Sequence, residues 1–413
     1  MIARIKSGRI SGEIIAPPSK SFAHRYLISA YLSNKECYIR NVGNSKDVLA
    51  TLGALKSLGA EYTILKDGVK IKRVDYGNGS RIVDCKESGS TMRFLMPVAT
   101  ALGISADFIG EGRLMERPIE KLTECLNAHG GKIQGHSVKG KLESGVYEID
   151  ASVSSQYISG LMFALPLLDG DSKIVYKNKL VSKGYLDVTE EVLKQFNIEV
   201  NKLEEGYFIK GGQRYEPSDL VVEGDFSGAS FILSSGAING KVTIKGLNAK
   251  TLQGDGEILE ILKRFGAKVT VRENQITVES KSLSGIEVDI ENIPDLAQII
   301  AVLGAYANGK TVIKNISRLR LKESDRLKAI TNMLDVAKIR YEQKENVLVI
   351  FGGNPIGGEF DGGLDHRTVM STAILCLHAN GDSIINGVEP IDKSYPEFFE
   401  DLIKLGGKVN VQV

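Results

Sequence analysis

Apolar residues at helical spacing recur along the chain, and each such pattern gives way to a small residue and then a short strand-forming run. The positions at which these helices are expected to end recur about every 70 residues, at Gly59, Gly130, Asn197, Gly266, Lys338 and Gly406. Glycine or asparagine at such a position predicts a left-handed C-cap, and Lys338 departs from that rule. The pattern therefore predicts six repeated units that fill the chain.

Each unit also opens with polar residues ahead of an apolar helix. These openings are Ser19-Lys20-Ser21, Ser88-Gly89-Ser90-Thr91, Ser154-Ser155-Gln156, Ser227-Gly228-Ala229, Pro294-Asp295 and Asp365-His366-Arg367. We expect them to be N-caps, so that the free N–H groups and positive dipole ends of the helices point at one surface. A turn, a strand, a second helix and further strands complete each unit, which predicts an α/β fold.

Composition narrows the function classes. The chain has 413 residues, enough for two or three domains, and its 52 basic and 51 acidic side chains nearly cancel. We therefore expect no nucleic-acid or membrane partner bound through bulk charge. The apolar stretch from Tyr157 to Leu168 is far shorter than the roughly 20 residues of a membrane span. Met1 to Lys6 lack the apolar core of a signal peptide, so we expect a cytoplasmic protein. Without C-x-x-C or H-E-x-x-H we expect neither a metal nor a cofactor.

The polar openings carry more charge than capping requires. One polar cluster alone is ordinarily a helix cap, and a charged run such as 318–326 is ordinarily a solvated helix face. Six openings in register, with Lys20, Arg25, Arg93 and Arg367 beside them, indicate more. Helix N-termini combined with Arg and Lys form sites for phosphate and carboxylate groups. The repeat therefore predicts a cleft for several anions where helix N-termini converge.

Nine motifs, in order along the whole chain, resemble those of the EPSP synthases, the 3-phosphoshikimate 1-carboxyvinyltransferases. They are Pro18-Ser19-Lys20-Ser21-x-x-x-Arg25, Ser88-Gly89-Ser90-Thr91-Met92-Arg93, Gly112-Arg113-Leu114-Met115-Glu116-Arg117-Pro118, Ser152-Val153-Ser154-Ser155-Gln156-Tyr157, Val181-Ser182-Lys183, Ile293-Pro294-Asp295, Leu321-Lys322-Glu323-Ser324-Asp325-Arg326, Asp365-His366-Arg367 and Asp392-Lys393-Ser394-Tyr395-Pro396. Each motif alone is weak, but nine in sequence are specific.

The resemblance implies transfer of the enolpyruvyl group of phosphoenolpyruvate to the 5-hydroxyl of shikimate 3-phosphate. Phosphate would leave by addition–elimination, in the shikimate pathway toward chorismate and the aromatic amino acids. It implies that shikimate 3-phosphate is bound by Lys20, Ser21, Arg25, Ser154, Ser155, Gln156, Ser182, Asp295 and Lys322. Phosphoenolpyruvate would be bound by Lys20, Gly89, Arg113, Gln156, Arg326, Arg367 and Lys393. The catalytic residues would be Asp295, as the proton acceptor, with Glu323 and Lys20.

The resemblance also implies a fold. We expect a two-lobed enolpyruvyl transferase fold of six βαβαββ repeats, three in each lobe, that forms an inside-out α/β barrel. One lobe would comprise residues 18–224, on the side of shikimate 3-phosphate. The other would comprise residues 1–17 and 225–413, on the side of phosphoenolpyruvate and catalysis, with the first strand running from Ile2 to Ile15. The active site would lie in the cleft between the lobes of a monomer.

Three alternatives remain to be weighed. The related UDP-N-acetylglucosamine enolpyruvyl transferases carry a cysteine in the loop that corresponds to Glu111–Leu114 and Lys-Asn in place of Lys20-Ser21, and neither feature is present. An RNA-3′-phosphate cyclase-like protein would need a nucleophilic histidine, for which His366 is the candidate. An anion-binding module without catalysis would have no reason to hold Asp295 and Glu323 among cations.

Overall fold

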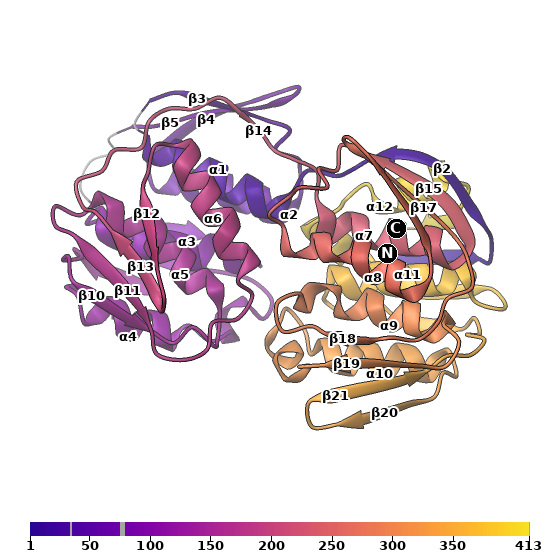
Figure 1. Cartoon of the computed structure of the whole chain (residues 1–413). Coiled ribbons are helices and arrows are strands. Elements are labelled where there is room, and N and C mark those ends of the chain that lie inside the picture. The colour runs from indigo at the N-terminus through magenta and orange to yellow at the C-terminus, as the bar shows by residue number, and fades with distance from the viewer. Residues whose placement is uncertain (34, 75–78, 413) are drawn as a thin grey trace. The chain divides into compact units, whose positions relative to one another are not determined.

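The computed structural model describes residues 1–33, 35–74 and 79–412, and the chain forms two compact units. The terminal unit comprises Met1–Ser19 and Glu223–Val413, and the middle unit comprises Lys20–Val222 (Figure 1). Each unit has its own hydrophobic core.

Helices and short strands alternate through the middle unit, with 3₁₀ helices labelled η. Its elements are α1 (Lys20–Leu32), β3 (Cys37–Arg40), α2 (Lys46–Ser57), β4 (Ala60–Leu65), β5 (Gly68–Arg73), β6 (Arg81–Asp84), α3 (Gly89–Ala101), β7 (Ala106–Ile109), η1 (Leu114–Glu116), α4 (Glu120–Asn127), β8 (Gly131–Gln134), β9 (Ser137–Gly140), β10 (Val146–Ile149), α5 (Ser155–Ala164), η2 (Leu165–Leu167), β11 (Ser172–Tyr176), α6 (Gly184–Gln195), β12 (Val200–Leu203), β13 (Gly206–Ile209) and β14 (Leu220–Val221).

The terminal unit repeats this alternation. Its elements are β1 (Ile2–Lys6), β2 (Ile10–Ile15), α7 (Phe226–Asn239), β15 (Gly240–Lys245), η3 (Gly254–Glu257), α8 (Ile258–Phe265), β16 (Lys268–Arg272), β17 (Gln275–Glu279), β18 (Glu287–Asp289), η4 (Pro294–Leu296), α9 (Ala297–Tyr306), β19 (Lys310–Lys314), η5 (Ser317–Leu321), α10 (Arg326–Val336), β20 (Tyr341–Lys344), β21 (Val347–Phe351), β22 (Glu359–Asp361), α11 (His366–His378), β23 (Ser383–Asn386), η6 (Glu389–Lys393), α12 (Phe398–Lys404) and β24 (Lys408–Gln412).

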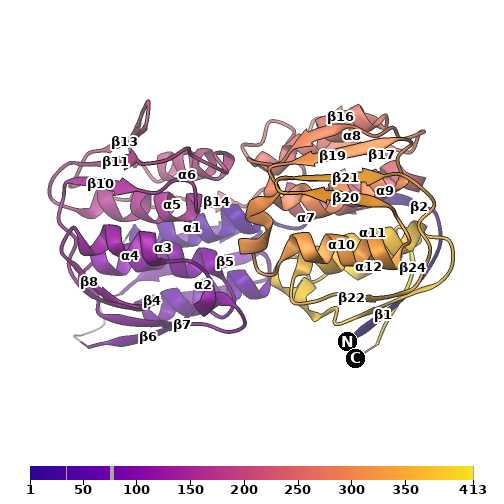
Figure 2. The ribbon, with the colours of Figure 1, turned by 90° about the horizontal axis from the view of Figure 1, so that it is seen from below.

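One sheet pattern recurs, and it confirms the predicted α/β repeats. In the sheet β6-β7-β9-β8, strands β6 and β7 are parallel, whereas β9 pairs antiparallel with both β7 and β8. Helix α3 joins the parallel pair and α4 leads to the antiparallel pair, which gives the order βαβαββ. The described residues form six such four-stranded sheets. Figure 2 shows β19, β21 and β20 of another copy side by side.

Strands distant in sequence complete three of the sheets. Strand β1 lies between β23 and β24, β2 pairs parallel with β15, and β14 pairs parallel with β3. Figure 1 shows β2, coloured indigo, beside β15. The prediction of one strand from Ile2 to Ile15 is wrong, because the chain turns after Lys6 and the N–H of Gly8 donates to the carbonyl of Leu377. Two short strands therefore serve two different sheets.

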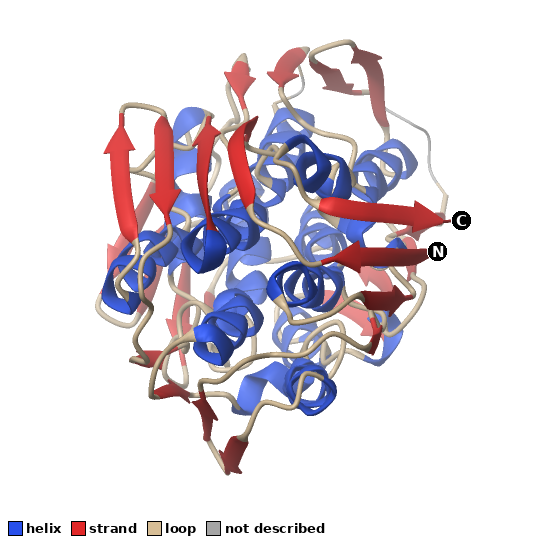
Figure 3. Cartoon of the chain, turned by 90° about the vertical axis from the view of Figure 1, so that its right-hand side faces the viewer, coloured by secondary structure: helices blue, strands red, loops and turns tan. Residues whose placement is uncertain are grey.

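The two helices of each repeat differ in burial. Helix α9 is almost entirely apolar and buried along nearly its whole length, and α1, α3, α5, α7 and α11 are also buried along most of their length. Helix α8 instead buries one face, through Ile258, Ile261, Leu262 and Phe265, as expected for a helix with one side toward solvent. Figure 3 shows helices inside and strands toward the outside in the unit that holds both termini. None of the helices in the described part of the chain is both long and apolar enough to cross a membrane.

The predicted helix ends are confirmed and prove more regular than the sequence suggested. All six anchor positions, Gly59, Gly130, Asn197, Gly266, Lys338 and Gly406, have φ between 58° and 106°. Lys338 therefore does not depart from the left-handed rule, since its φ is 58°. Its conformation follows from the end of α10 although a lysine side chain disfavours it.

The predicted N-caps hold at some helices and not at others. Ser88, Ser154 and Asp365 cap α3, α5 and α11 by accepting backbone N–H bonds. Helix α7 is instead capped by Asp225, which accepts from the N–H of Gly228, so the expectation for Ser227 is wrong. The helix begins two residues earlier than its polar cluster indicated, and Ser227 is freed for another contact.

Candidate active site

A buried arginine holds three carboxylates together in the terminal unit. Arg326, the first residue of α10, is 1% exposed at its side chain. Its Nη1 lies 2.6 Å from Oδ1 of Asp295, its Nη2 lies 2.6 Å from Oε2 of Glu323, and its Nε lies 2.8 Å from Oδ2 of Asp365. Because a guanidinium presents five donors in a fixed plane, it can bond to three acids at once. Each of the three guanidinium nitrogens of Arg326 thus donates to a different carboxylate.

Asp295 in turn is surrounded by cations. Besides Arg326, its oxygens lie 3.0 Å from Nη2 of Arg367 and 3.3 Å from Nζ of Lys322. Asp295 sits in η4 just before α9, and Arg367 sits in the first turn of α11. Successive repeats therefore bring one carboxylate and three cationic side chains to one place. A carboxylate held this way is oriented to receive a proton from a group placed beside it.

Arg367 and Lys393 extend the cluster. Arg367 donates from Nη2 to Oγ of Ser227 at 2.6 Å, and its Nη1 is bonded to Nε2 of His366. Lys393, at the end of η6, donates to the carbonyl of Leu364 at 2.8 Å, next to the cap residue Asp365. We call Asp295, Lys322, Glu323, Arg326, Asp365, Arg367 and Lys393 the arginine cluster.

Burial shifts the acidity of several groups in this cluster. Burial lowers the pKa of Lys322, against the opposing charge of Asp295. Burial also disfavours the charge of Arg326, but the carboxylates of Asp365, Glu323 and Asp295 hold its pKa well above its usual value.

Asp255, in η3, was not predicted from the sequence. Its pKa is raised to about 7 by burial and by the charge of Asp295, against the effect of Arg367.

The middle unit holds a second group of predicted residues, of which Arg25 on α1 is the most buried. Arg25 is 2% exposed and donates to Oγ1 of Thr189, to the carbonyl of Ser21 and to the carbonyl of Tyr185, at 2.8, 2.9 and 3.0 Å. Burial lowers its pKa to about 10. Among the residues that the structure describes, no carboxylate lies within ion-pair distance of it. A buried cation with only neutral partners is suited to receive an anion.

Lys20 begins α1 and is partnered by an acid. Its Nζ lies 2.7 Å from Oδ2 of Asp47, at the start of α2, and both side chains are largely buried. Ser21 follows it on the same helix turn as Arg25. The predicted residues Lys20, Ser21 and Arg25 therefore lie together.

Helices α3 and α5 meet at a polar network. Gln156 donates from Nε2 to Oγ of Ser90 at 2.9 Å and accepts from Nη1 of Arg93 at 2.8 Å. Gly89, the first residue of α3, is overlain by an arginine, since a Cβ there would lie 2.7 Å from Nη1 of Arg117. The structure thus places Gln156 against Arg93 and Gly89 against Arg117.

The remaining predicted residues make fewer contacts with the groups described above. Ser154 caps α5, Ser155 begins that helix, and Ser182 is buried with φ 55°. Arg113 is 41% exposed at its side chain, with its Nε 3.7 Å from Oε2 of Glu116. Arg113 is therefore not part of the Gly89 network in this structure.

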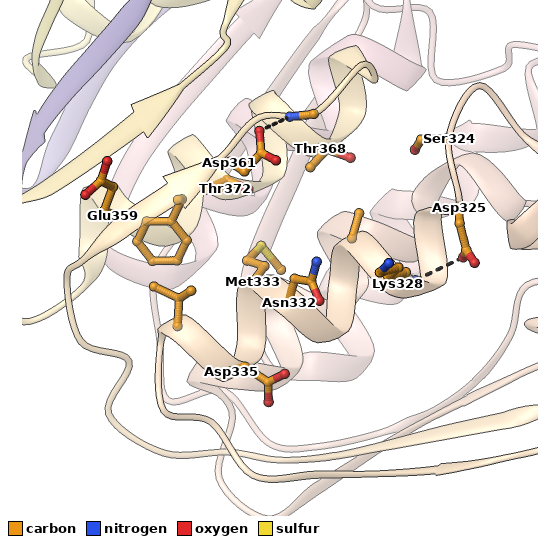
Figure 4. Close-up of a pocket in the computed structure, with 14 residues that line it drawn as sticks. Ser324, Asp325, Lys328, Asn332, Met333, Asp335, Glu359, Asp361, Thr368 and Thr372 are labelled. Carbon is orange, nitrogen blue, oxygen red and sulfur yellow. Dashed lines mark hydrogen bonds between the residues drawn. The ribbon is translucent and has the colours of Figure 1, made fainter. Parts of the chain in front are cut away.

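An open hollow of about 500 Å³ lies beside the arginine cluster, between α10, β22 and the start of α11. Figure 4 shows acidic side chains, among them Asp325, Asp335, Glu359 and Asp361, around it. Ser324 lines it and donates to Oδ2 of Asp365 at 3.2 Å. None of the predicted site residues lines this hollow.

Sequence reasoning missed several members of these groups. Asp365 was predicted as a cap and not as a partner of Arg326, and Asp47 and Asp255 were not singled out. Arg117 was noted within its motif, but its position over Gly89 was not predicted. The only local signal for Asp255 is its polar position ahead of an apolar helix, which many surface acids share. Within the described ranges, no three His, Cys, Asp or Glu side chains are grouped so that they could hold a metal ion.

Comparison with known proteins places these groups in context. The pattern of a protein family described as EPSP synthase (3-phosphoshikimate 1-carboxyvinyltransferase) matches residues 5–402. The 3-phosphoshikimate 1-carboxyvinyltransferase of Clostridium acetobutylicum is 40% identical over 97% of this chain and 96% of its own length. That of Clostridium kluyveri is also 40% identical, over 98% and 97%.

Solved structures show the fold. An EPSP synthase structure from Acinetobacter baumannii superposes with a TM-score of 0.85 at 24% identity and covers 100% of both chains. The enolpyruvyl transferase NikO from Streptomyces tendae gives 0.78 at 17% identity, covering 99% of this chain and 98% of its own. The predicted enolpyruvyl transferase fold is thereby confirmed.

Proposed function

Because the chain belongs to the EPSP synthase (3-phosphoshikimate 1-carboxyvinyltransferase) family, we propose how its residues divide the work of that reaction. The protein is a transferase that moves the enolpyruvyl group of phosphoenolpyruvate to shikimate 3-phosphate, in the shikimate pathway of aromatic amino-acid biosynthesis.

Shikimate 3-phosphate is bound mainly by the middle unit. The uncompensated charge of buried Arg25 supports this assignment, since a phosphate would supply the missing anion. The hydroxyls of Ser21, Ser154 and Ser182 and the amide of Gln156 add neutral hydrogen bonds. The full set is Lys20, Ser21, Arg25, Ser154, Ser155, Gln156 and Ser182, with Asp295 and Lys322 from the terminal unit.

Phosphoenolpyruvate is bound by several cations. Arg326, Arg367 and Lys393 already lie near one another in the arginine cluster. Gly89 contributes its backbone N–H at the start of α3, where a side chain would collide with Arg117. The full set is Lys20, Gly89, Arg113, Gln156, Arg326, Arg367 and Lys393.

Asp295 and Glu323 carry the proton transfers. The observation that carries this assignment is that Arg326 bonds to both carboxylates at 2.6 Å and so holds two acids on one guanidinium. A site that only bound anions would gain nothing from two carboxylates among its cations, because they would repel the ligands. Their presence is explained by a reaction in which protons are given and taken.

The proposed path is addition followed by elimination. Glu323 donates a proton to the methylene carbon of phosphoenolpyruvate, and the 5-hydroxyl oxygen attacks the neighbouring carbon while Asp295 accepts the hydroxyl proton. The Glu323 carboxylate then takes a proton back from the new methyl group, which restores the double bond as phosphate leaves with its bridging oxygen. Lys20 and the arginines hold the phosphate as a leaving group and offset its charge.

Other expectations remain proposals. We propose a cytoplasmic monomer that acts on two small molecules, needs no metal or cofactor, and has no nucleic-acid or membrane partner. The near-zero net charge of +1 supports the last point.

The roles are tested by separating binding from chemistry. Asp295→Asn keeps the shape of the side chain but removes the base, so turnover should fall by about 10²–10⁴ while shikimate 3-phosphate still binds. Phosphate release and calorimetric binding measure the two effects. The matched control is Asp335→Asn, because Asp335 lies near the C-terminal end of α10, away from Arg326, and its carboxylate accepts a hydrogen bond from the hydroxyl of Tyr341. Near-normal turnover by Asp295→Asn would refute its role as the base.

A further inference from the structure

Four buried side chains of the middle unit form a continuous hydrogen-bonded chain. Nδ1 of His24 lies 2.6 Å from Oγ1 of Thr51, which lies 2.6 Å from Oγ1 of Thr91. The Thr91 hydroxyl donates to Oγ of Ser88 at 2.7 Å, and the backbone N–H of Thr91 donates to the same oxygen. Each of the four residues is at most 1% exposed.

The protons of this chain can run in only one direction. Each threonine hydroxyl has one proton, and that of Thr91 goes to Ser88. The short contact between the threonines therefore needs the proton of Thr51, whose other possible acceptor, the carbonyl of Asp47, is farther away at 3.4 Å. Thr51 must then accept from His24, so that His24 carries its proton on Nδ1.

The other ring nitrogen agrees with this tautomer. Nε2 of His24 is buried and has no hydrogen-bond partner among the residues that the structure describes. A second proton there would place an unpaired cationic donor in the core. Burial and the nearby charges of Lys20 and Arg25 hold the pKa of His24 well below its usual value. His24 is thus a neutral donor.

The hydrogen-bonded chain joins helices α1, α2 and α3, and the first and last of these carry proposed substrate contacts. His24 lies on α1 between Lys20 and Arg25, Thr51 lies on α2 one turn after Asp47, and Ser88 caps α3 immediately before Gly89. A substitution at Thr51 should therefore alter the position of the N-terminus of α3, although Thr51 itself is not assigned to either substrate.

We propose that His24, Thr51 and Thr91 are positioning residues, which through Ser88 fix the start of α3, and with it Gly89, against the helix of Lys20 and Arg25. The chain sets the approach of phosphoenolpyruvate to the N–H groups of α3 and leaves shikimate 3-phosphate little affected. This inference rests on the proposed contact between Gly89 and phosphoenolpyruvate.

Kinetics of Thr51 variants test the proposal. Thr51→Val removes the hydroxyl and should raise the KM for phosphoenolpyruvate by roughly two- to tenfold, the change that one neutral hydrogen bond corresponds to. The KM for shikimate 3-phosphate should stay within about twofold, and Thr51→Ser, which keeps the hydroxyl, should restore the phosphoenolpyruvate value. A merely structural role would reduce the fraction of folded enzyme and leave both KM values unchanged.

Thr100→Val is the matched control. Thr100 is a buried threonine on α3, the helix that also carries Thr91. Its hydroxyl donates to the carbonyl of Met96 at 2.8 Å, one turn earlier in that helix. This variant loses a buried hydroxyl of the same kind but should leave both KM values within about twofold. An equal KM change in Thr51→Val and Thr100→Val would overturn the proposal.

Two readouts do not depend on turnover. ¹⁵N spectra of histidine-labelled wild-type protein should show His24 protonated at Nδ1 and not at Nε2; the opposite tautomer would overturn the proposal even if no variant folds. Hydrogen–deuterium exchange should speed up at 88–93 in Thr51→Val and not in Thr100→Val, and unchanged exchange there would also overturn it. If wild-type enzyme showed no transferase activity, the proposed function would fail. These two readouts would still decide whether the hydrogen bonds from His24 to Ser88 fix the start of α3.

Discussion

Arg326 is important both for the proposed chemistry and for the stability of the terminal unit. Its guanidinium bonds to Asp295, Glu323 and Asp365, and its side chain is 1% exposed. Buried acids of this kind are tolerable only while their cation remains in place. The residue proposed to bind phosphoenolpyruvate is therefore also the one that keeps three carboxylates from repelling one another.

Lysine at this position should not replace arginine. Arg326→Lys keeps the charge but has a compact ammonium, which cannot reach three carboxylates in a fixed plane. We expect the free energy of unfolding to fall by about 2–4 kcal/mol and turnover to fall by about 10²-fold. Urea unfolding and phosphate release measure these changes.

Arg320→Lys is the control for that substitution. Arg320 is half-exposed and, within the described residues, its one acid contact is with Asp325 at 3.4 Å, so both quantities should stay near their wild-type values. If Arg326→Lys left the free energy of unfolding and the turnover as unchanged as Arg320→Lys, the three-way pairing of Arg326 would be shown not to matter for either.

Asp255 predicts a pH dependence of stability. Its pKa in the folded protein is raised to about 7 from an ordinary value of 3.8, chiefly by burial. Between about pH 4 and about pH 7 the unfolded chain releases this proton while the folded protein keeps it, so the group reduces stability progressively as pH rises through that window. Below it the group costs nothing.

Asp255→Asn should remove this dependence, because an amide stays neutral. The difference in unfolding free energy, variant minus wild type, should be more favourable at about pH 8 than at about pH 4 by at least about 1.4 kcal/mol, one pKa unit. Urea unfolding at the two pH values measures it. An equal difference at both would show that Asp255 ionises normally in the folded protein.

At the scale of helices and strands, the sequence predicted the periodic features well. The recurrence of a small residue about every 70 residues locates the left-handed helix ends, because only backbone geometry decides them. It did not predict the break between β1 and β2, since apolar residues on both sides of Gly8 read as one strand. Nor did it choose Asp225 over Ser227 as the cap of α7, because both residue types are good caps.

Lys338 provides a test at this scale. Its φ of 58° strains an exposed lysine, so Lys338→Gly should raise the free energy of unfolding by about 1 kcal/mol. Asn197→Gly is the matched comparison, with φ 60° at the same place in another repeat. Asparagine tolerates this conformation, so the change there should be smaller. Calorimetric unfolding compares the two, and a loss of stability in Lys338→Gly would contradict the account.

At the scale of the whole molecule, family motifs predicted which residues to consider but not how they pair. The pairing of Lys20 with Asp47 depends on how α1 packs on α2, and that of Arg326 with Asp365 depends on the approach of two repeats. Neither is encoded in local spacing. Arg113 shows the converse, since it belongs to one of the family motifs while its side chain is half-exposed and its ion-pair contact is with Glu116.

The central claim is that the paired acids on Arg326 serve a reaction at carbon and that the cations hold phosphate as a leaving group. The most direct test is turnover of phosphoenolpyruvate labelled with ¹⁸O at its bridging oxygen, with shikimate 3-phosphate in D₂O, analysed by mass spectrometry. Addition–elimination breaks the C–O bond and forms a methyl group transiently, so the label should appear in inorganic phosphate and deuterium in the methylene group of the product. Label retained in the organic product, or a product without deuterium, would contradict the account and the roles given to Asp295 and Glu323.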